Sequence, residues 1–241
     1  MISVAVVGAS GRMGSLAIDL IDADANLKLH AALGSKSELS QMLGADVVLD
    51  FTLPSVSPKV VEFAIQHDLK IVVGTSGWSE IHLQGLKKLL AEHPKAAAVV
   101  IPNFSIGSML AQQFAVQAAR YFDSIEIVEA HHAGKVDSPS GTAVRNAEQI
   151  AAARKDMVAP LIPGVDQPAR GQVVSGVPIH SLRLQGVSAK QDVIFGAGHE
   201  LLTVSHEVSS HHAYSEGIRR CILFAQQSTG LTVGLDQVVT G

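Results

Sequence analysis

Near its start the chain reads Ile2-Ser-Val-Ala-Val-Val7-Gly8-Ala-Ser-Gly11-Arg-Met-Gly14. The first six of these residues form an apolar run rich in β-branched side chains, which predicts a strand buried in a parallel sheet. The amphipathic pattern that follows predicts a helix to about Ile21 or Asp22. A strand, a glycine turn and a helix in this order are typical of dinucleotide sites, because the glycines permit a tight turn, the approach of a pyrophosphate and close helix packing. Glycines that serve packing alone are the alternative.

Strands and helices alternate through the first hundred residues, which predicts an α/β fold with a Rossmann-like parallel sheet. Further strands are predicted at Leu27–Leu33, Ala45–Phe51, Lys70–Val73 and Ala96–Ile101, and helices at Ser57–His67 and Ser79–His93. Three short segments directly follow strands: Asp50-Phe51-Thr52, Gly74-Thr75-Ser76 and Pro102-Asn103-Phe104. Ligands of open parallel sheets bind at the carboxyl ends of the strands, so these segments are predicted to contact a flat cofactor.

The pattern changes after residue 105 and predicts a second, smaller α+β domain with a mixed sheet. Its elements are predicted as helices at Ile106–Phe122 and Thr142 to about Met157, and strands at Ser124–Ala130, Pro178–Leu184, Gln191–Phe195 and Glu200–His206, with a polar stretch from Pro160 to Pro178. A last helix is predicted at Ser215–Gln226. We therefore expect a dinucleotide-binding domain at 1–104, completed by the C-terminal helix at about 214–241, and a second domain at 105–213.

Composition excludes several classes of partner. The 241 residues carry 18 basic and 22 acidic side chains, for a formal net charge of −4, and no basic stripe with aromatics occurs, so no nucleic-acid partner is expected. No apolar run reaches the ~20 residues that a membrane span needs, so no membrane association is expected. The single cysteine, Cys221, suits a reducing cytoplasm.

The most specific segment is Glu129-Ala-His131-His132-Ala-Gly-Lys135-Val-Asp-Ser-Pro-Ser-Gly-Thr-Ala143. It places two imidazoles and an ammonium group, which can donate protons or hold an anion, before a Pro-Ser-Gly-Thr turn that opens a helix. The first N–H groups of a helix bind carboxylate or phosphate. The segment therefore predicts a site for an anionic substrate that must be protonated.

Two other interpretations of the His131-His132 pair remain open. Such pairs are often structural, and they can also bind metal. Zinc usually takes three or four ligands, and Cys221 lies in an apolar helical pattern, so no metal is predicted.

The chain resembles the 4-hydroxy-tetrahydrodipicolinate reductase (dihydrodipicolinate reductase) family of bacterial lysine and diaminopimelate biosynthesis. The family signature is approximately E-x-H-H-x-x-K-x-D-x-P-S-G-T-A, and Glu129–Ala143 matches every fixed position. Similar blocks are Gly8–Gly14, the three segments after the strands, and Val177-Pro-Ile-His-Ser-Leu-Arg183. The similarity spans essentially the whole chain.

The resemblance implies reduction of a cyclic, dicarboxylated imine, with loss of water, by a homotetramer that uses NADH or NADPH. It also implies that 105–213 is the substrate-binding and tetramerisation domain. It implies that His131 and Lys135 are the proton donors. On physical grounds, Glu129 and Asp137 are expected to orient neighbouring groups rather than to react. Substrate contacts are implied at His132, Ser140, Gly141 and Thr142. Cofactor contacts are implied at Gly8, Ala9, Ser10, Gly11, Arg12, Met13, Phe51, Gly74, Thr75, Ser76, Ile101, Pro102, Asn103 and Phe104.

Cofactor choice is predicted from the end of the second strand. NAD-preferring enzymes usually place a carboxylate there to bind the ribose hydroxyls, but this chain reads Leu33-Gly-Ser35-Lys36. Ser35, Lys36 and Arg12 can instead hold a 2′-phosphate, so NADPH, or dual use with NADH, is favoured. A second departure is His211, where the family often has an arginine.

Two other functions are compatible with parts of the pattern. Another two-domain nicotinamide dehydrogenase of amino-acid metabolism would need a catalytic cysteine or a different lysine–aspartate arrangement. A non-catalytic dinucleotide sensor would keep Gly8–Gly14 without needing His131, Lys135 and the Ser-Gly-Thr turn together.

Overall fold

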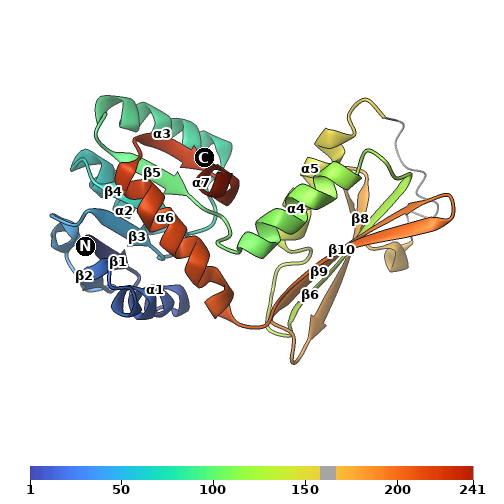
Figure 1. Ribbon diagram of the computed structural model, residues 1–241, viewed down its shortest axis with the longest axis horizontal. Coiled ribbons are helices and arrows are strands. Elements are labelled where there is room, and N and C mark those ends of the chain that lie inside the picture. Colours follow the sequence, from blue (N-terminus) through green and yellow to red (C-terminus); the bar gives the residue numbers. More distant parts are fainter. Residues whose placement is uncertain (158–166, 241) are drawn as a thin grey trace. The chain divides into compact units, whose positions relative to one another are not determined.

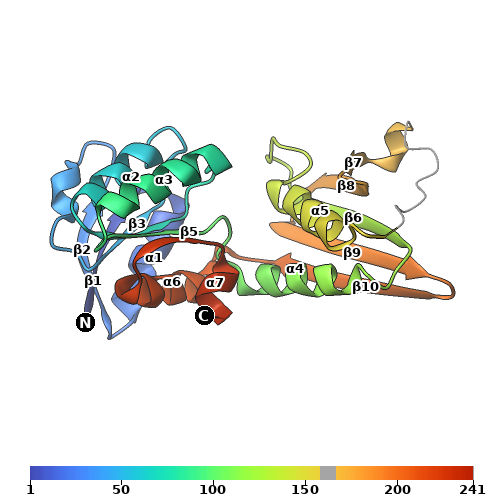
Figure 2. The same ribbon diagram turned by 90° about the horizontal axis from the view of Figure 1, so that it is seen from above.

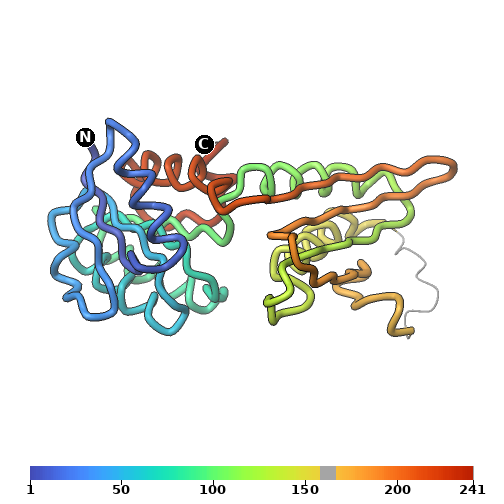
Figure 3. Tube along the Cα trace, turned by 90° about the horizontal axis from the view of Figure 1, so that it is seen from below, coloured from blue at the N-terminus to red at the C-terminus, as the bar shows by residue number. Residues whose placement is uncertain are grey.

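The computed structural model describes residues 1–157 and 167–240, which divide into two compact units. Unit 1 comprises Met1–Ile106 and His211–Gly241, and unit 2 comprises Gly107–Ser210. In Figure 3 the C-terminal segment, in red, returns among the elements formed by the first hundred residues. The predicted polar stretch from Pro160 lies partly outside the described residues.

Unit 1 is built on a six-stranded parallel sheet with the strand order β11-β5-β4-β3-β1-β2. The strands are β1 (Ile2–Val7), β2 (Leu27–Leu33), β3 (Val47–Asp50), β4 (Lys70–Val73), β5 (Ala97–Val100) and β11 (Gly230–Val233). Strands β3 and β5 are buried along their whole length, as expected for a sheet covered on both faces. The predicted Rossmann-like sheet is confirmed.

Helices cover both faces of this sheet, with α2 and α3 on one face and α1 and α6 on the other (Figure 2). The helical elements of unit 1 are α1 (Arg12–Ala23), η1 (Leu39–Met42), α2 (Ser57–Gln66), α3 (Glu80–Glu92), η3 (His211–Tyr214), α6 (Ser215–Gln227) and α7 (Leu235–Thr240). Helix α6 comes so close to the chain after β5 that a Cβ on Gly217 would overlap the Phe104 carbonyl oxygen. The C-terminal segment is therefore an integral part of unit 1.

Unit 2 has a five-stranded mixed sheet with the order β10-β9-β6-β8-β7, and α4 and α5 cover one of its faces (Figure 1). Its elements are α4 (Ile106–Ala118), β6 (Ser124–His132), α5 (Gly141–Ala153), η2 (Pro168–Arg170), β7 (Gln172–Val174), β8 (Val177–Leu184), β9 (Ala189–Ala197) and β10 (Glu200–Val208). Strand β6 pairs parallel with β8 and antiparallel with β9, which confirms the predicted mixed sheet. The core packs Ile127, Ile150 and Phe195 between the helices and the sheet.

Two strands lie outside the predicted set. Strand β7 has only three residues, and β11 begins with Gly230 and includes Thr232, so neither forms an apolar run that indicates a strand. Each pairs along its length with a neighbouring strand, β7 with β8 and β11 with β5. In the part of the chain that the structure describes, no helix is long and apolar enough to cross a membrane.

A charged cluster ties the segment before β7 to the centre of the unit 2 sheet. Glu126 on β6 accepts hydrogen bonds from Arg170 Nη2 at 2.5 Å and from His180 Nε2 at 2.7 Å. Burial raises the pKa of the Glu126 carboxyl, but the bonds from Arg170 and His180 outweigh it and hold the pKa below its usual 4.5.

Glu126→Gln is expected to reduce the stability of unit 2 at neutral pH but not in acid. Because the folded-state pKa is depressed, the stabilisation is present above about pH 4.5 and is lost as the pH falls through the lower folded-state value. Thermal unfolding of both proteins between pH 7 and pH 3 measures this, with exposed Glu148→Gln as the control. Parallel pH curves for Glu126→Gln and the unaltered protein would contradict the assignment.

Candidate active site and cofactor cradle

Strand β6 carries two residues of the signature, Glu129 and His131, on its helix-covered face. Residues of a strand alternate between faces, so Ile127, Glu129 and His131 share one side. The Glu129 side chain is fully buried, and its Oε2 lies 2.5 Å from His131 Nδ1. Glu129 therefore fixes the orientation of the imidazole and leaves Nε2 as the nitrogen free to exchange a proton with a ligand.

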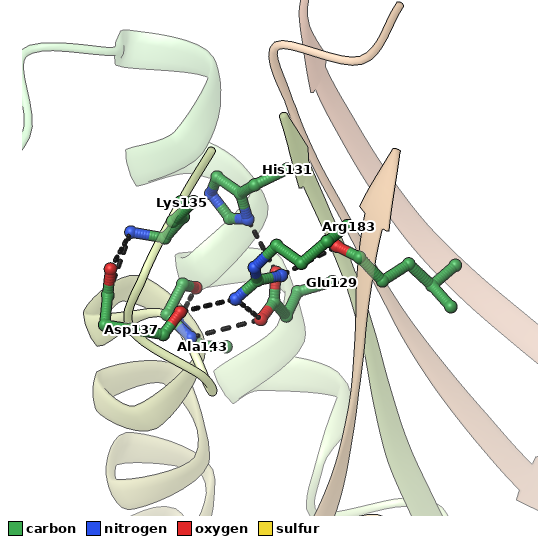
Figure 4. Close-up of polar contacts among 8 residues, drawn as sticks. Glu129, His131, Lys135, Asp137, Ala143 and Arg183 are labelled. Atoms are coloured by element: carbon green, nitrogen blue, oxygen red, sulfur yellow. Dashed lines mark hydrogen bonds and ion pairs between the residues drawn. The ribbon is translucent and has the colours of Figure 1, made fainter. Parts of the chain in front are cut away.

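Arg183 on β8 completes this arrangement (Figure 4). Its Nη1 and Nη2 each lie 3.0 Å from a different Glu129 oxygen, so the guanidinium and the carboxylate form a bidentate pair. Nη2 also donates to the Asp137 carbonyl oxygen at 2.5 Å, and Nη1 to the Leu182 carbonyl oxygen at 2.7 Å. No role for Arg183 was predicted, although it ends the Val177–Arg183 block.

The electrostatics of the site keep Glu129 ionised. Burial raises the pKa of its carboxyl, but hydrogen bonds from Arg183, Ser181 and His131 outweigh burial and hold the pKa below its ordinary value. A buried negative charge is thus held beside His131 Nδ1.

Lys135 lies in the turn after β6, where its backbone N–H donates to the His132 carbonyl oxygen at 3.0 Å. Its ammonium contacts both Asp137 carboxylate oxygens, at 2.7 and 2.9 Å (Figure 4). This contact is the first cause of a lowered pKa of Asp137. The Lys135 side chain is 22% exposed and that of Asp137 60%, so solvent competes for the pair and a substrate carboxylate can replace Asp137.

Helix α5 begins at Gly141, next to these side chains. Ser140 is its N-cap, and the buried Ser140 hydroxyl accepts from the Ala143 N–H at 3.3 Å. The Ser140 N–H donates to Glu129 Oε1 at 3.2 Å, which joins the helix start to β6. Gly141 and Thr142 are exposed, and a Cβ on Gly141 would meet nothing within 4 Å. These two residues present the helix N-terminus to an anion, whereas the Ser140 hydroxyl is already used by the cap.

The glycine turn of unit 1 forms a close backbone cradle. Gly8 has φ +84°, and a Cβ there would lie 2.5 Å from the Phe51 carbonyl oxygen. A Cβ on Gly14 would overlap the Gly8 carbonyl oxygen and fall 2.8 Å from Ala9 Cα. Gly11 is the N-cap of α1 and supplies no side chain to it. The turn therefore fits a dinucleotide, since bare backbone and the start of α1 can meet a pyrophosphate.

Asp50 organises the edge of the sheet beside this cradle. The fully buried carboxylate accepts from Thr52 N at 3.0 Å, from Thr52 Oγ1 at 2.6 Å and from Thr75 Oγ1 at 3.3 Å, and also from the Ser57 hydroxyl. It thereby fixes the ends of β3 and β4 together. The segment Asp50-Phe51-Thr52 was predicted to contact the cofactor, with Phe51 as its site residue, but nothing in the sequence indicates that the Asp50 side chain faces inward and joins strand ends.

Two aromatic rings and a glycine follow the same sheet edge. The rings of Phe51 and Phe104 meet edge to face with centroids 5.7 Å apart. A Cβ on Gly74 would overlap Phe51 and lie 2.8 Å from Phe104 Cε2. This corner accordingly has flat apolar surfaces and room only for glycine. The Ile101 side chain is fully buried, so of this residue only the backbone is left for a ligand.

The structure brings some of the other predicted cofactor residues to the surface of unit 1. Ser10, Arg12, Ser35, Lys36 and Ser76 are exposed. Exposed Ser35 and Lys36 directly follow β2, as a phosphate contact requires.

The chain's return into unit 1 passes close to the start of α1. The rings of His211 and His212 stack with centroids 4.8 Å apart. Burial raises the pKa of Tyr214, and the nearby Arg12 charge opposes the rise.

Within the described ranges 1–157 and 167–240, no group of three His, Cys, Asp or Glu side chains is placed to hold a metal ion.

Comparison with known proteins identifies the family. The family model for the N-terminus of dihydrodipicolinate reductase matches residues 2–104, and that for the C-terminus matches residues 107–239. The chain is 50% identical over 237 residues to the 4-hydroxy-tetrahydrodipicolinate reductase of Clavibacter sepedonicus, covering 98% of this chain and 86% of the relative. It is 43% identical over 240 residues to that of Cutibacterium acnes, covering 98% of both.

A solved structure agrees with the sequence matches. Dipicolinate-bound dihydrodipicolinate reductase from Paenisporosarcina sp. TG-14 has a TM-score of 0.85 and 30% identity, covering 99% of this chain and 100% of the other. The resemblance predicted from Glu129–Ala143 is confirmed. The chain belongs to the dihydrodipicolinate reductase family.

Proposed function

We propose that this chain reduces 4-hydroxy-tetrahydrodipicolinate to tetrahydrodipicolinate with NADPH or NADH, in lysine and diaminopimelate biosynthesis. The observation that carries the proposal is the linked set Glu129, His131 and Arg183 beside Lys135 and the start of α5, in a chain that matches the family along its length. Both family models match, and unit 1 has the backbone cradle that a dinucleotide needs.

The substrate is a dianion, and this chain supplies groups for its carboxylates. Lys135 exchanges its Asp137 partner for one carboxylate, and the N–H groups of Gly141 and Thr142 receive the same or the other carboxylate. His132 is exposed at the end of β6 and adds a further contact. These contacts orient the ring and exclude water from it.

Proton delivery falls to His131, with Lys135 as the second donor. Loss of the substrate's 4-hydroxyl group as water leaves a carbon–carbon double bond conjugated with the imine, and a nicotinamide held in unit 1 would supply the hydride that reduces this bond. Negative charge then spreads onto the substrate nitrogen, and His131 Nε2 donates the proton that quenches it. Glu129 holds Nδ1 and stabilises the charged imidazolium before the transfer. In unit 1, Gly8–Met13, Phe51, Gly74–Ser76 and Ile101–Phe104 hold the cofactor.

Lys36→Ala is expected to lower kcat/KM with NADPH about tenfold and to leave kcat/KM with NADH within about twofold, because a charge-assisted bond to the 2′-phosphate is lost. Steady-state kinetics with both cofactors measure this, and Lys28→Ala, at an exposed lysine on β2, is the control. An equal effect on both cofactors would remove the preference for NADPH.

The proposal includes a homotetramer and a cytoplasmic location. The family resemblance supports the tetramer, and the single cysteine, buried on α6, suits a reducing compartment. Sedimentation of the purified chain tests the assembly.

A coupled assay tests the activity. A synthase generates the unstable substrate from pyruvate and aspartate semialdehyde, and oxidation of NADPH or NADH is followed by absorbance. Rapid oxidation that depends on the synthase is the expected result. Oxidation with other amino-acid precursors alone would identify a different dehydrogenase, and cofactor binding without any oxidation would identify a sensor.

A further inference from the structure

Arg183 forms hydrogen bonds with several parts of the candidate site, which no sequence pattern indicates. From β8 its guanidinium reaches the Glu129 carboxylate on β6, its neighbour's carbonyl at Leu182, and the carbonyl of Asp137 in the loop that bears Lys135. The register pairs His131 with Arg183 and Glu129 with Ser181 across the two parallel strands. One side chain thus connects the proton-donor strand to the loop that carries the substrate-binding ammonium (Figure 4).

The pair that Arg183 forms is rigid and largely removed from water. Glu129 is fully buried and the Arg183 side chain is 19% exposed. Two parallel N–H···O bonds fix both position and angle of the carboxylate, which a lysine could not do. The remaining bond of Glu129 Oε2 goes to His131 Nδ1, so any tilt of the carboxylate would turn the imidazole.

We propose that Arg183 is the positioning residue of this site: it aims His131 through Glu129 and anchors the Lys135 loop through the Asp137 carbonyl. The inference rests on the proposed function for its catalytic meaning. Arg183 touches no reacting atom in this role, and it sets the distance between the two proton donors and the start of α5. A displacement of about 1 Å at such a site costs about 100-fold in rate.

The charges around His131 give the proposal a second consequence. The negative Glu129 carboxylate contacts the His131 ring, and the positive Arg183 guanidinium on β8 contacts the same carboxylate. The other charged groups nearby are the Lys135–Asp137 pair of the loop. On β9 the residue opposite is Ala189, and Lys190 next to it pairs with Asp192. Arg145 and Glu148 of α5 are exposed to solvent.

Neutralising the two partners should therefore shift the pH profile in opposite directions. A general acid loses activity as the pH rises past its deprotonation, so Glu129→Gln should lose activity at lower pH and Arg183→Gln at higher pH than the unaltered protein. Arg183→Lys keeps the charge and should restore the pH profile without restoring the rate. A residue needed only for folding would not produce this pattern.

The experiment compares Arg183→Gln, Arg183→Lys, Glu129→Gln and the control Arg120→Gln, which changes an exposed arginine of the same unit. We expect Arg183→Gln to lower kcat about 100-fold and raise the substrate KM about tenfold, with NADPH affinity within about twofold. Unchanged kcat in Arg183→Gln, or the same pH profile in both Gln variants, would overturn the proposal. If Arg183→Gln does not fold, Arg183→Lys is tested for a reduced kcat with a normal pH profile.

NMR of the His131 imidazole separates this proposal from the proposed function. Its ring resonances report protonation and ring orientation without turnover. Opposite shifts of the titration in Glu129→Gln and Arg183→Gln support the positioning role even if the coupled assay shows no activity. No change of the His131 resonances in either variant would refute the positioning role even if the enzyme is active.

Discussion

Lys135→Ala is expected to lower turnover by about two to four orders of magnitude while NADPH affinity stays within about twofold. The ammonium is predicted to hold a substrate carboxylate and to act as the second proton donor, so its loss removes both binding and acid catalysis. The cofactor cradle lies in unit 1, on residues that do not include Lys135. Loss of rate without loss of cofactor binding is therefore the expected signature.

Lys190→Ala provides the matched control for this prediction. Lys190 forms an ion pair with Asp192, two residues further along the chain, as Lys135 does with Asp137. The N–O distance is 3.3 Å in the first pair and 2.7 Å in the second. The two substitutions remove the same kind of pair from the same unit, but Lys190 is not part of the signature. Coupled-assay kinetics and NADPH fluorescence titration measure both variants. Near-normal turnover in Lys135→Ala would remove Lys135 from the mechanism.

The sequence predicts the main elements of the fold because burial imposes clear patterns on it. Strand β4 has the predicted bounds, and β3 and β5 differ by one or two residues at each end. Residues in buried parallel strands are mostly apolar, so each strand appears as a short apolar run. Strands β7 and β11 escape prediction because pairing with a neighbour, rather than their own side chains, makes them extended.

The candidate site likewise has a part that the sequence predicts and a part that it does not. His131, Lys135 and the start of α5 are adjacent in sequence, so their chemistry is apparent from the signature alone. Arg183 is 54 residues from Glu129, and only the register of β6 against β8 brings the two together. Asp50 likewise gains its role from contacts with Thr75 on a neighbouring strand end. Long-range pairing of this kind depends on strand order, which local patterns do not specify.

The sequence also does not indicate which glycines are indispensable. The turn motif assigns Gly8 a role, but other glycines of the chain have no obvious one. The structure distinguishes these glycines by the atoms that an added Cβ would contact. At Gly8 the Cβ would overlap the Phe51 carbonyl oxygen, whereas at Gly85 on α3 it would meet nothing within 4 Å. The two positions therefore respond in opposite ways to the same change.

Gly8→Ala is expected to abolish cofactor binding and to destabilise unit 1 by more than about 2 kcal/mol. An L side chain in the left-handed region costs about 1–2 kcal/mol, and the overlap with the Phe51 backbone forces apart the ends of β1 and β3 as well. Gly85→Ala, exposed within a helix, should instead stabilise by about 0.5–1 kcal/mol. Urea unfolding and NADPH titration of both variants measure these effects. Intact NADPH affinity in Gly8→Ala would mean that the cofactor does not approach the β1–α1 turn, and the whole cofactor assignment in unit 1 would have to be placed elsewhere.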